Sequence, residues 1–151
     1  MEAIIFCGIQ ASGKSTFLKE YFFKTHIRIS LDLLGTRHKE NIFLQTCFAA
    51  RQRFVVDNTN ATKKHRLKYI EKAKTYGFRV IGYYFQTSVD DAIARNKNRN
   101  GKEYIPVVGI KSTYKKFQSP VYDEDFDDLY HVEIVNNNFI VKAIEHKIPA
   151  E

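Results

Sequence analysis

Close to its start the chain reads Ala3-Ile4-Ile5-Phe6-Cys7-Gly8-Ile9-Gln10-Ala11-Ser12-Gly13-Lys14-Ser15-Thr16. A short apolar run leads into the pattern G-x-x-x-x-G-K-[ST], and every fixed position of that pattern is matched. Glycines let backbone N–H groups close around phosphate oxygens, and the helix that follows presents its positive end to the anion. The stretch therefore predicts a strand, a phosphate-binding loop and a helix, and it indicates that the chain binds a nucleoside triphosphate.

The loop assigns an expected task to its polar residues. Lys14 is expected to reach the β- and γ-phosphates of ATP and to act in catalysis, while the Ser15 hydroxyl is expected to bind Mg²⁺. The residues predicted to bind ATP through the loop are Gly8, Ser12, Gly13, Lys14, Ser15 and Thr16. The alternative is an ordinary turn between a strand and a helix, which does not require the full pattern.

Length and composition predict one folded domain that spans residues 1–151. Of its 151 residues, 44% are hydrophobic and 14% are aromatic, which suffices for a real core and excludes a disordered chain. Cys7 and Cys47 lie far apart in apolar surroundings, as expected of reduced core thiols in a cytoplasmic protein. Glu2 stands where a signal peptide would carry positive charge, and no apolar run approaches the roughly 20 residues that cross a bilayer. We therefore expect no membrane partner.

The net charge of +7 predicts a partner more anionic than ATP, and nucleic acid is the natural candidate. Basic residues crowd the segments 63–79 and 95–116, and acidic residues gather in 123–128. Lys and Arg are also ordinary on exposed helices, so the first basic segment is expected to be a solvated helix face. The acidic segment is expected to be a loop.

The chain alternates between strand and helix patterns along most of its length. Strands are predicted at 3–7, 27–31, 54–56, 78–85, 131–135 and 139–144, and helices at 15–24, 38–51, 62–77, from Ser88 onward, and at 106–117. This order predicts an α/β fold of three layers, in which helices cover both faces of a central, mostly parallel sheet.

Two carboxylates follow predicted strands. Asp32 ends the second strand and Asp57 ends the third, and the carboxyl ends of parallel strands meet at the ligand-binding edge of such a sheet. One carboxylate would hold Mg²⁺, and the other would accept a proton from an acceptor hydroxyl. Each Asp has a plainer alternative, which is to cap the turn that follows its strand.

A helical lid is predicted at about residues 95–106. Arg95 and Arg99 are four residues apart and share a helix face, from which both would reach the nucleotide phosphates. Gly101 would allow the segment to close over the site and exclude water. Solvated arginines beside a flexible loop are the alternative.

Taken together, these motifs resemble the 5′-kinase domain of polynucleotide kinases between about Ile4 and Phe117. The resemblance rests on the phosphate loop, Leu31-Asp32, Val56-Asp57-Asn58-Thr59-Asn60 and Arg95-Asn96-x-x-Arg99 followed by Pro106. It implies a single P-loop kinase domain that uses ATP and Mg²⁺ to phosphorylate the 5′-hydroxyl end of DNA or RNA. It further implies that Asp32 is the general base, that Arg95 and Arg99 bind ATP phosphates, with Arg99 catalytic, and that Asp57, Thr59 and Asn60 form the acceptor side.

The chain departs from the family at one position. The family commonly has Asp-x-x-Arg, in which the arginine binds a phosphate of the acceptor strand, whereas here the third residue after Asp32 is Gly35. Arg37 would have to substitute for it. Two alternatives therefore stay open: a kinase for a nucleoside, sugar or other small metabolite, and a nucleotide-dependent binding module without turnover. The sequence also lacks an Asp-x-Asp-x-Thr phosphatase motif at a strand end, so no 3′-phosphatase activity is expected.

Overall fold

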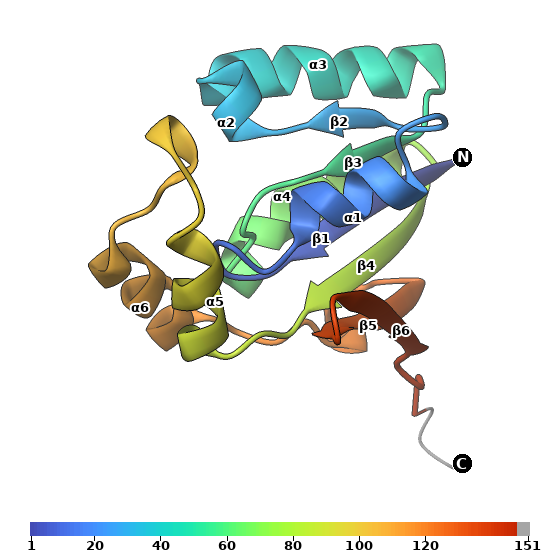
Figure 1. The fold of residues 1–151 in the computed structure, drawn as a ribbon. Helices are drawn as coiled ribbons and strands as arrows, with labels where there is room; N and C mark the ends of the chain where they lie inside the picture. The colour runs from blue at the N-terminus through green and yellow to red at the C-terminus, as the bar shows by residue number, and fades with distance from the viewer. Residues whose placement is uncertain (148–151) are drawn as a thin grey trace.

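The computed structural model describes residues 1–147 and contains one six-stranded sheet in the order β2-β3-β1-β4-β5-β6 (Figure 1). The strands are β1 (Glu2–Cys7), β2 (Ile27–Ile29), β3 (Phe54–Val56), β4 (Arg79–Phe85), β5 (Asp128–Val135) and β6 (Asn138–Ala143). Every neighbouring pair is parallel except the hairpin of β5 and β6. The expected mostly parallel sheet is confirmed.

Helices pack on both faces of this sheet. They are α1 (Lys14–Tyr21), α2 (Leu31–Leu34), α3 (Arg37–Ala50), α4 (Lys63–Thr75), α5 (Val89–Asn96) and α6 (Val107–Lys116), with short 3₁₀ turns η1 (Gly101–Glu103) and η2 (Tyr122–Glu124). The hydroxyls of Thr62 and Ser88 accept backbone N–H groups at the starts of α4 and α5. Both helices begin close to the positions that the sequence predicts, and these hydroxyls satisfy otherwise unpaired donors.

The central strand β1 divides the core in two. Ala3, Ile5 and Cys7 pack with α3 and α4 on one face, whereas Ile4 and Phe6 pack with α1 on the other. Successive side chains of a strand point to opposite faces, so a strand covered on both sides is apolar at every position. The architecture is the three-layer P-loop kinase fold that the sequence predicts.

The second strand ends earlier than predicted, and Asp32 lies on the short helix α2 instead of a strand end. The backbone N–H of Leu31 donates to Asn58 Oδ1 at 2.9 Å, which satisfies the first helical donor. Gly35 closes the helix with φ of +84°, a conformation that glycine adopts without strain. A contact from the loop after β3 and a local glycine therefore define the two ends of this helix.

The expectations for the charged segments need correction at two residues. Arg66 of α4 was expected on a solvated face, but its side chain is 0% exposed, and its Nε donates to Glu124 Oε1 at 2.7 Å. Glu124 belongs to the acidic segment that was expected to be only a loop. Instead, this segment forms η2 and supplies the carboxylate that neutralises a buried guanidinium.

Both cysteines are free and buried, as predicted. Burial raises the pKa of the Cys7 thiol to about 12, so this thiol is held in its unreactive protonated form. Across residues 1–147, no helix combines the length and the apolar character that crossing a membrane requires.

Candidate active site

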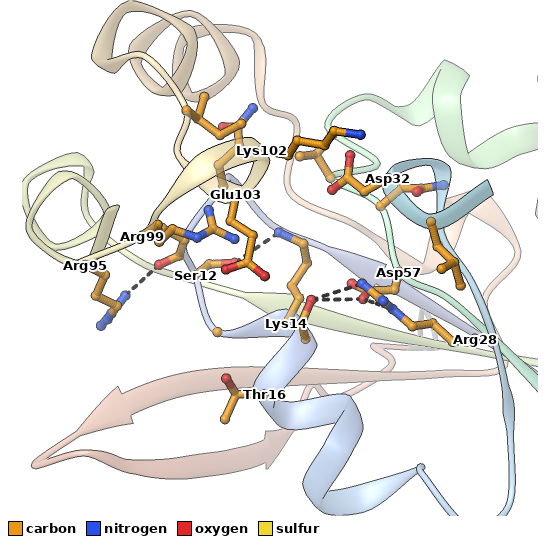
Figure 2. Close-up of a pocket in the computed structure, with 18 residues that line it drawn as sticks. Ser12, Lys14, Thr16, Arg28, Asp32, Asp57, Arg95, Arg99, Lys102 and Glu103 are labelled. Carbon is orange, nitrogen blue, oxygen red and sulfur yellow. Dashed lines mark hydrogen bonds and ion pairs between the residues drawn. The ribbon is translucent and has the colours of Figure 1, made fainter. Parts of the chain in front are cut away.

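A cavity of about 550 Å³ lies at the carboxyl ends of β1, β2 and β3 (Figure 2). Open parallel sheets bind ligands at this edge. Four segments line the cavity: residues 10–16 of the phosphate loop and α1; Arg28, Asp32 and Leu33 around α2; Asp57, Asn58 and Thr59 after β3; and Arg95, Arg99, Lys102, Glu103 and Ile105 of the lid.

The two glycines of the loop are required by close packing. A Cβ on Gly8 would lie 2.8 Å from Ser12 Oγ and 2.9 Å from Phe85 Cβ. Gly13 has φ of +95°, and a Cβ there would lie 2.9 Å from Ile134 Cδ1 in β5. Neither position accepts a side chain without displacement of its neighbours, so the loop keeps the shape that exposes backbone donors to an anion.

The Lys14 ammonium lies across the loop. It donates to the carbonyl oxygens of Gly8 at 3.0 Å and Ile9 at 2.8 Å, and to Ser12 Oγ at 3.3 Å. Burial lowers its pKa to about 8, while the nearby carboxylates of Asp57 and Asp32 oppose that shift. The cation is therefore incompletely neutralised within the cavity, an arrangement suited to an anionic ligand.

Next to Lys14, the side chains of Ser15 and Asp57 place two oxygen-bearing groups in contact. Ser15 Oγ donates to Asp57 Oδ2 at 3.1 Å, and the Asp57 side chain is 2% exposed. A hydroxyl and a carboxylate in contact are hard oxygen donors, which fit Mg²⁺. Arg28 of β2 also reaches this pair, because its Nε donates to the same Oδ2 at 2.8 Å.

Asp32 faces the same cavity from α2 (Figure 2). Its charge contributes to the pKa of Lys14, which places the two side chains within electrostatic reach. A carboxylate thus lies across the cavity from the phosphate loop. An acceptor of a phosphoryl group would have to bind between the two.

The lid begins at the end of α5. Arg95 Nη1 donates to the Ala11 carbonyl at 3.2 Å and to Thr87 Oγ1 at 2.9 Å, and Arg99 lines the cavity and helps to lower the pKa of Lys14. Asn96 is 1% exposed and joins the two ends of the lid segment. Its Nδ2 donates to the Ile105 carbonyl at 2.6 Å, and its Oδ1 accepts the Ile105 N–H at 3.0 Å.

Most of the predicted site residues meet at this cavity, but Gly8, Asn60 and Arg37 do not line it. Asn60 is buried with φ of +45°, and its Nδ2 donates to the Phe6 carbonyl at 2.7 Å, so it ties the loop after β3 to β1. Arg37 lines a neighbouring cavity of about 290 Å³ with Lys68 and Lys72. Asn58 lines the main cavity, and its Nδ2 donates at 3.2 Å to Oε2 of Glu40, which lines the second one.

Sequence reasoning missed several residues that line the main cavity, namely Gln10, Arg28, Leu33, Lys102 and Glu103. Arg28 left a signal, because it interrupts the apolar strand Ile27-Arg28-Ile29 with a charge. Arg28 is only partly exposed on the edge strand β2, and a partly buried charge favours a partner of opposite sign. The lid residues left no comparable signal, since Lys and Glu are ordinary in polar loops.

The fold and the phosphate loop beneath an arginine-bearing lid define a nucleotide-binding P-loop domain of the kinase type. The chain belongs to the AAA domain family, whose model matches residues 37–120.

Two curated relatives match most of the chain. One is a bifunctional polynucleotide phosphatase/kinase of Schizosaccharomyces pombe, 25% identical over 137 residues that cover 87% of this chain and 33% of the relative. The other is a putative enzyme of the same name from Acanthamoeba polyphaga mimivirus, 25% identical over 136 residues that cover 85% of this chain and 32% of the relative. The chain spans about a third of the length of these relatives. The resemblance to polynucleotide kinases that the motifs predict is confirmed.

Two solved structures with the same fold carry names that differ from each other and from those of the curated relatives. A gluconokinase from Sinorhizobium meliloti superposes with a TM-score of 0.59 at 17% identity, covering 89% of this chain and 83% of its own. Kti12 from Chaetomium thermophilum in complex with ADP-AlF3 superposes with a TM-score of 0.62 at 17% identity, covering 87% of this chain and 88% of its own. At this identity both establish the fold alone.

Proposed function

We propose that this chain, as a single P-loop kinase domain of 151 residues, transfers the γ-phosphate of ATP to the 5′-hydroxyl end of DNA or RNA. The observation that carries the proposal is that Asp32 and Lys14 line one cavity from opposite elements, α2 and the phosphate loop. A base on one side and a phosphate-binding cation on the other is the arrangement that phosphoryl transfer to an alcohol requires.

On the nucleotide side, the loop from Gly8 to Thr16 would hold the phosphates through backbone donors. Lys14 would move from the loop carbonyls to the β- and γ-phosphates, and Arg95 and Arg99 would bind the same phosphates from the lid. Ser15 Oγ and Asp57 would hold Mg²⁺, which neutralises phosphate charge when bound. The contact between these two side chains supports that assignment.

In the transfer step, the 5′-hydroxyl oxygen attacks the γ-phosphorus, and the Asp32 carboxylate accepts the proton of that hydroxyl. The bond between that phosphorus and the bridging oxygen breaks, and ADP leaves with the bonding electrons. Lys14 and Arg99 stabilise the charge that spreads over the transferred group. The lid keeps water, the competing acceptor, away from the phosphate.

Charge supports a polynucleotide as the acceptor. The chain carries a net charge of +7, and Arg37, Lys68 and Lys72 share the second cavity next to the one that holds Asp32. Thr59 lines the main cavity on the acceptor side, and Asn60 would act by fixing the loop that carries Thr59. The names of the two curated relatives agree with this acceptor, and the free thiols suit a cytoplasmic location.

A small-molecule acceptor is the second candidate, and Gly35 favours it. This residue stands where the polynucleotide kinase family commonly has its strand-binding arginine, and a Cβ there would meet nothing within 4 Å. An acceptor without a phosphodiester, such as a nucleoside or sugar, would not need that arginine.

The test compares Asp32→Asn with the wild type in transfer of labelled γ-phosphate to an oligonucleotide with a 5′-hydroxyl. Loss of the base should reduce transfer by about 10²- to 10⁴-fold, with ATP binding retained. Asp123→Asn, a change of an exposed carboxylate in η2, is the matched control. Equal transfer by the Asp32 variant and the control would eliminate Asp32 as the base.

A further inference from the structure

Arg28 closes a triangle of hydrogen bonds with Ser15 and Asp57 (Figure 2). Its Nε donates to Asp57 Oδ2 at 2.8 Å, and its Nη2 donates to Ser15 Oγ at 3.3 Å. Ser15 Oγ in turn donates to the same Asp57 Oδ2 at 3.1 Å. One guanidinium therefore contacts the Ser15 hydroxyl and one carboxylate oxygen of Asp57, the two residues that the proposed function assigns to Mg²⁺.

Arg28 and Asp57 differ in how far their side chains are exposed to solvent. The Asp57 side chain is 2% exposed, whereas that of Arg28 is 35% exposed. A carboxylate buried to that extent needs a cation nearby, because isolated charges are costly away from water. The guanidinium, which retains access to solvent, is the partner that can move.

The backbone of Arg28 is fixed, so only its side chain can move. Arg28 lies opposite Val55 in the parallel pairing of β2 with β3, and Asp57 N donates to the Ile29 carbonyl at 2.8 Å just beyond that pairing. Departure from Asp57 therefore needs rotation of a long side chain and no change in the sheet. Such rotations are fast compared with catalysis.

We propose that Arg28 is an internal counter-cation that competes with the divalent ion for Ser15 and Asp57, and thereby sets the Mg²⁺ concentration at which the nucleotide binds tightly. This inference rests on the metal site assigned under the proposed function. A hydroxyl oxygen that accepts an N–H from Arg28 cannot offer the same lone pair to a metal. Two cations at one carboxylate oxygen also repel each other.

A purely structural ion pair would behave differently. If Arg28 only neutralised Asp57 for folding, its removal would destabilise the protein and leave the metal-dependent part of nucleotide affinity unchanged. Competition instead predicts that removal frees the oxygen pair and strengthens that part. The two roles therefore differ in a binding ratio and not merely in stability.

The experiment measures ADP affinity by calorimetry, once with excess Mg²⁺ and once with EDTA, and takes the ratio of the two dissociation constants. The ratio is the dissociation constant with EDTA divided by the one with Mg²⁺. In Arg28→Gln it should be about tenfold larger than in the wild type. Arg28→Lys keeps a competing charge and should stay close to the wild-type ratio. The matched control is Arg53→Gln, which removes an exposed arginine just before β3.

A second measurement uses the wild-type protein and does not depend on a variant that folds. The Nε–H proton of Arg28 should exchange slowly with water in the EDTA complex with ADP, because it is bonded to a buried carboxylate. Addition of Mg²⁺ should accelerate that exchange. Continued slow exchange with Mg²⁺ bound would overturn the proposal.

The outcomes separate this inference from the proposed function. An unchanged or smaller ratio in Arg28→Gln overturns the competition, and the metal site stands if Asp57→Asn abolishes the effect of Mg²⁺ in the same assay. If Mg²⁺ does not change ADP affinity in the wild type, the metal site is wrong and the inference falls with it.

Discussion

Lys14 illustrates how burial prepares a single side chain for an anion. Its ammonium is bound to two loop carbonyls and one hydroxyl, none of which carries a full negative charge. Desolvation lowers its pKa to about 8, so a fraction of the molecules lose the proton in mildly alkaline solution. A phosphate group that arrived beside Lys14 would favour the charged form and raise that pKa.

Nucleotide affinity should therefore fall as pH rises from 7 to 9. Below pH 8 the lysine is charged before binding, whereas above it the protein must take up a proton to bind the phosphates, which costs affinity. Calorimetry in buffers of different ionisation enthalpy should detect this proton uptake at pH 8. In Lys14→Arg the charge is fixed and the pH dependence should disappear. A wild-type affinity that stays constant over this range would contradict the expectation.

The buried pair of Arg66 and Glu124 is the second residue-scale feature. Arg66 also donates through Nη1 to the carbonyls of Asn60 and Gln118, each at 2.9 Å. One guanidinium therefore holds the loop after β3, the segment after α6 and η2 together. Glu124→Gln leaves this buried cation without its counter-charge and should lower the free energy of unfolding by about 3–5 kcal/mol.

Chemical denaturation measures this loss, and Asp123→Asn is the matched control because Asp123 is the exposed neighbour of Glu124. In Arg66→Met combined with Glu124→Gln, the loss should be smaller than the sum of the two single losses. Additive losses would show that the two side chains do not act as a pair.

Residues of this kind mark the limit of sequence reasoning. The phosphate loop was predictable because its spacing encodes a backbone shape, and the structure has the predicted strand, loop and helix. The burial of Arg66 was not predictable, since its partner Glu124 lies 58 positions away and both read as ordinary surface charges. Arg28 interrupts an apolar strand and so left a local signal, but its partner Asp57 lies 29 positions away and could not be identified from that pattern.

At the scale of elements, the lid is a segment pinned at both ends. Asn96 bonds twice to the backbone of Ile105, so the residues between them form a closed loop that carries Arg99 over the cavity. Gly101 has φ of +59° within this loop and permits its tight turn. The lid near residues 95–106 stays a prediction from the sequence, and the anchoring of this segment by Asn96 was not anticipated.

Asn96→Ala should loosen the lid and uncouple Arg99 from the phosphates. We expect kcat/KM for phosphoryl transfer to fall about tenfold or more, and ATP hydrolysis without acceptor to rise relative to transfer, because a loose lid admits water. Measurement of both rates for this variant and for Asn98→Ala, an exposed neighbour, separates the anchor from a general surface effect. An unchanged ratio of hydrolysis to transfer would contradict the role of the anchor.

Element order was predictable and one short helix was not. Alternating apolar runs and caps such as Thr62 and Ser88 encode local structure, so most helices and strands lie within a few residues of their predicted bounds. Helix α2 spans four residues and starts where Asn58 accepts a backbone N–H, a contact from the loop after β3. Local sequence carries no trace of that contact, although it positions Asp32.

At the scale of the whole molecule, the excess of positive charge should appear in acceptor binding. Affinity for a single-stranded oligonucleotide with a 5′-hydroxyl should fall steeply as salt rises, while a neutral nucleoside should show almost no dependence. Arg37→Gln should lower the slope of log affinity against log salt by about 0.7 if Arg37 contacts a phosphate. Lys19→Gln, an exposed change on α1, serves as the charge-matched control. Equal slopes in the two variants would remove Arg37 from the acceptor site.

We propose that the alcohol accepted by this fold is the 5′-end of a nucleic acid, and a panel of acceptors distinguishes this alcohol from smaller ones. Labelled ATP is offered with Mg²⁺ to a 5′-hydroxyl oligonucleotide, a nucleoside 3′-monophosphate, a free nucleoside and gluconate. We predict the highest kcat/KM for the oligonucleotide and loss of that activity in Asp32→Asn. Preferential labelling of the free nucleoside or gluconate, with the oligonucleotide unlabelled, would rule out a nucleic acid end as the acceptor.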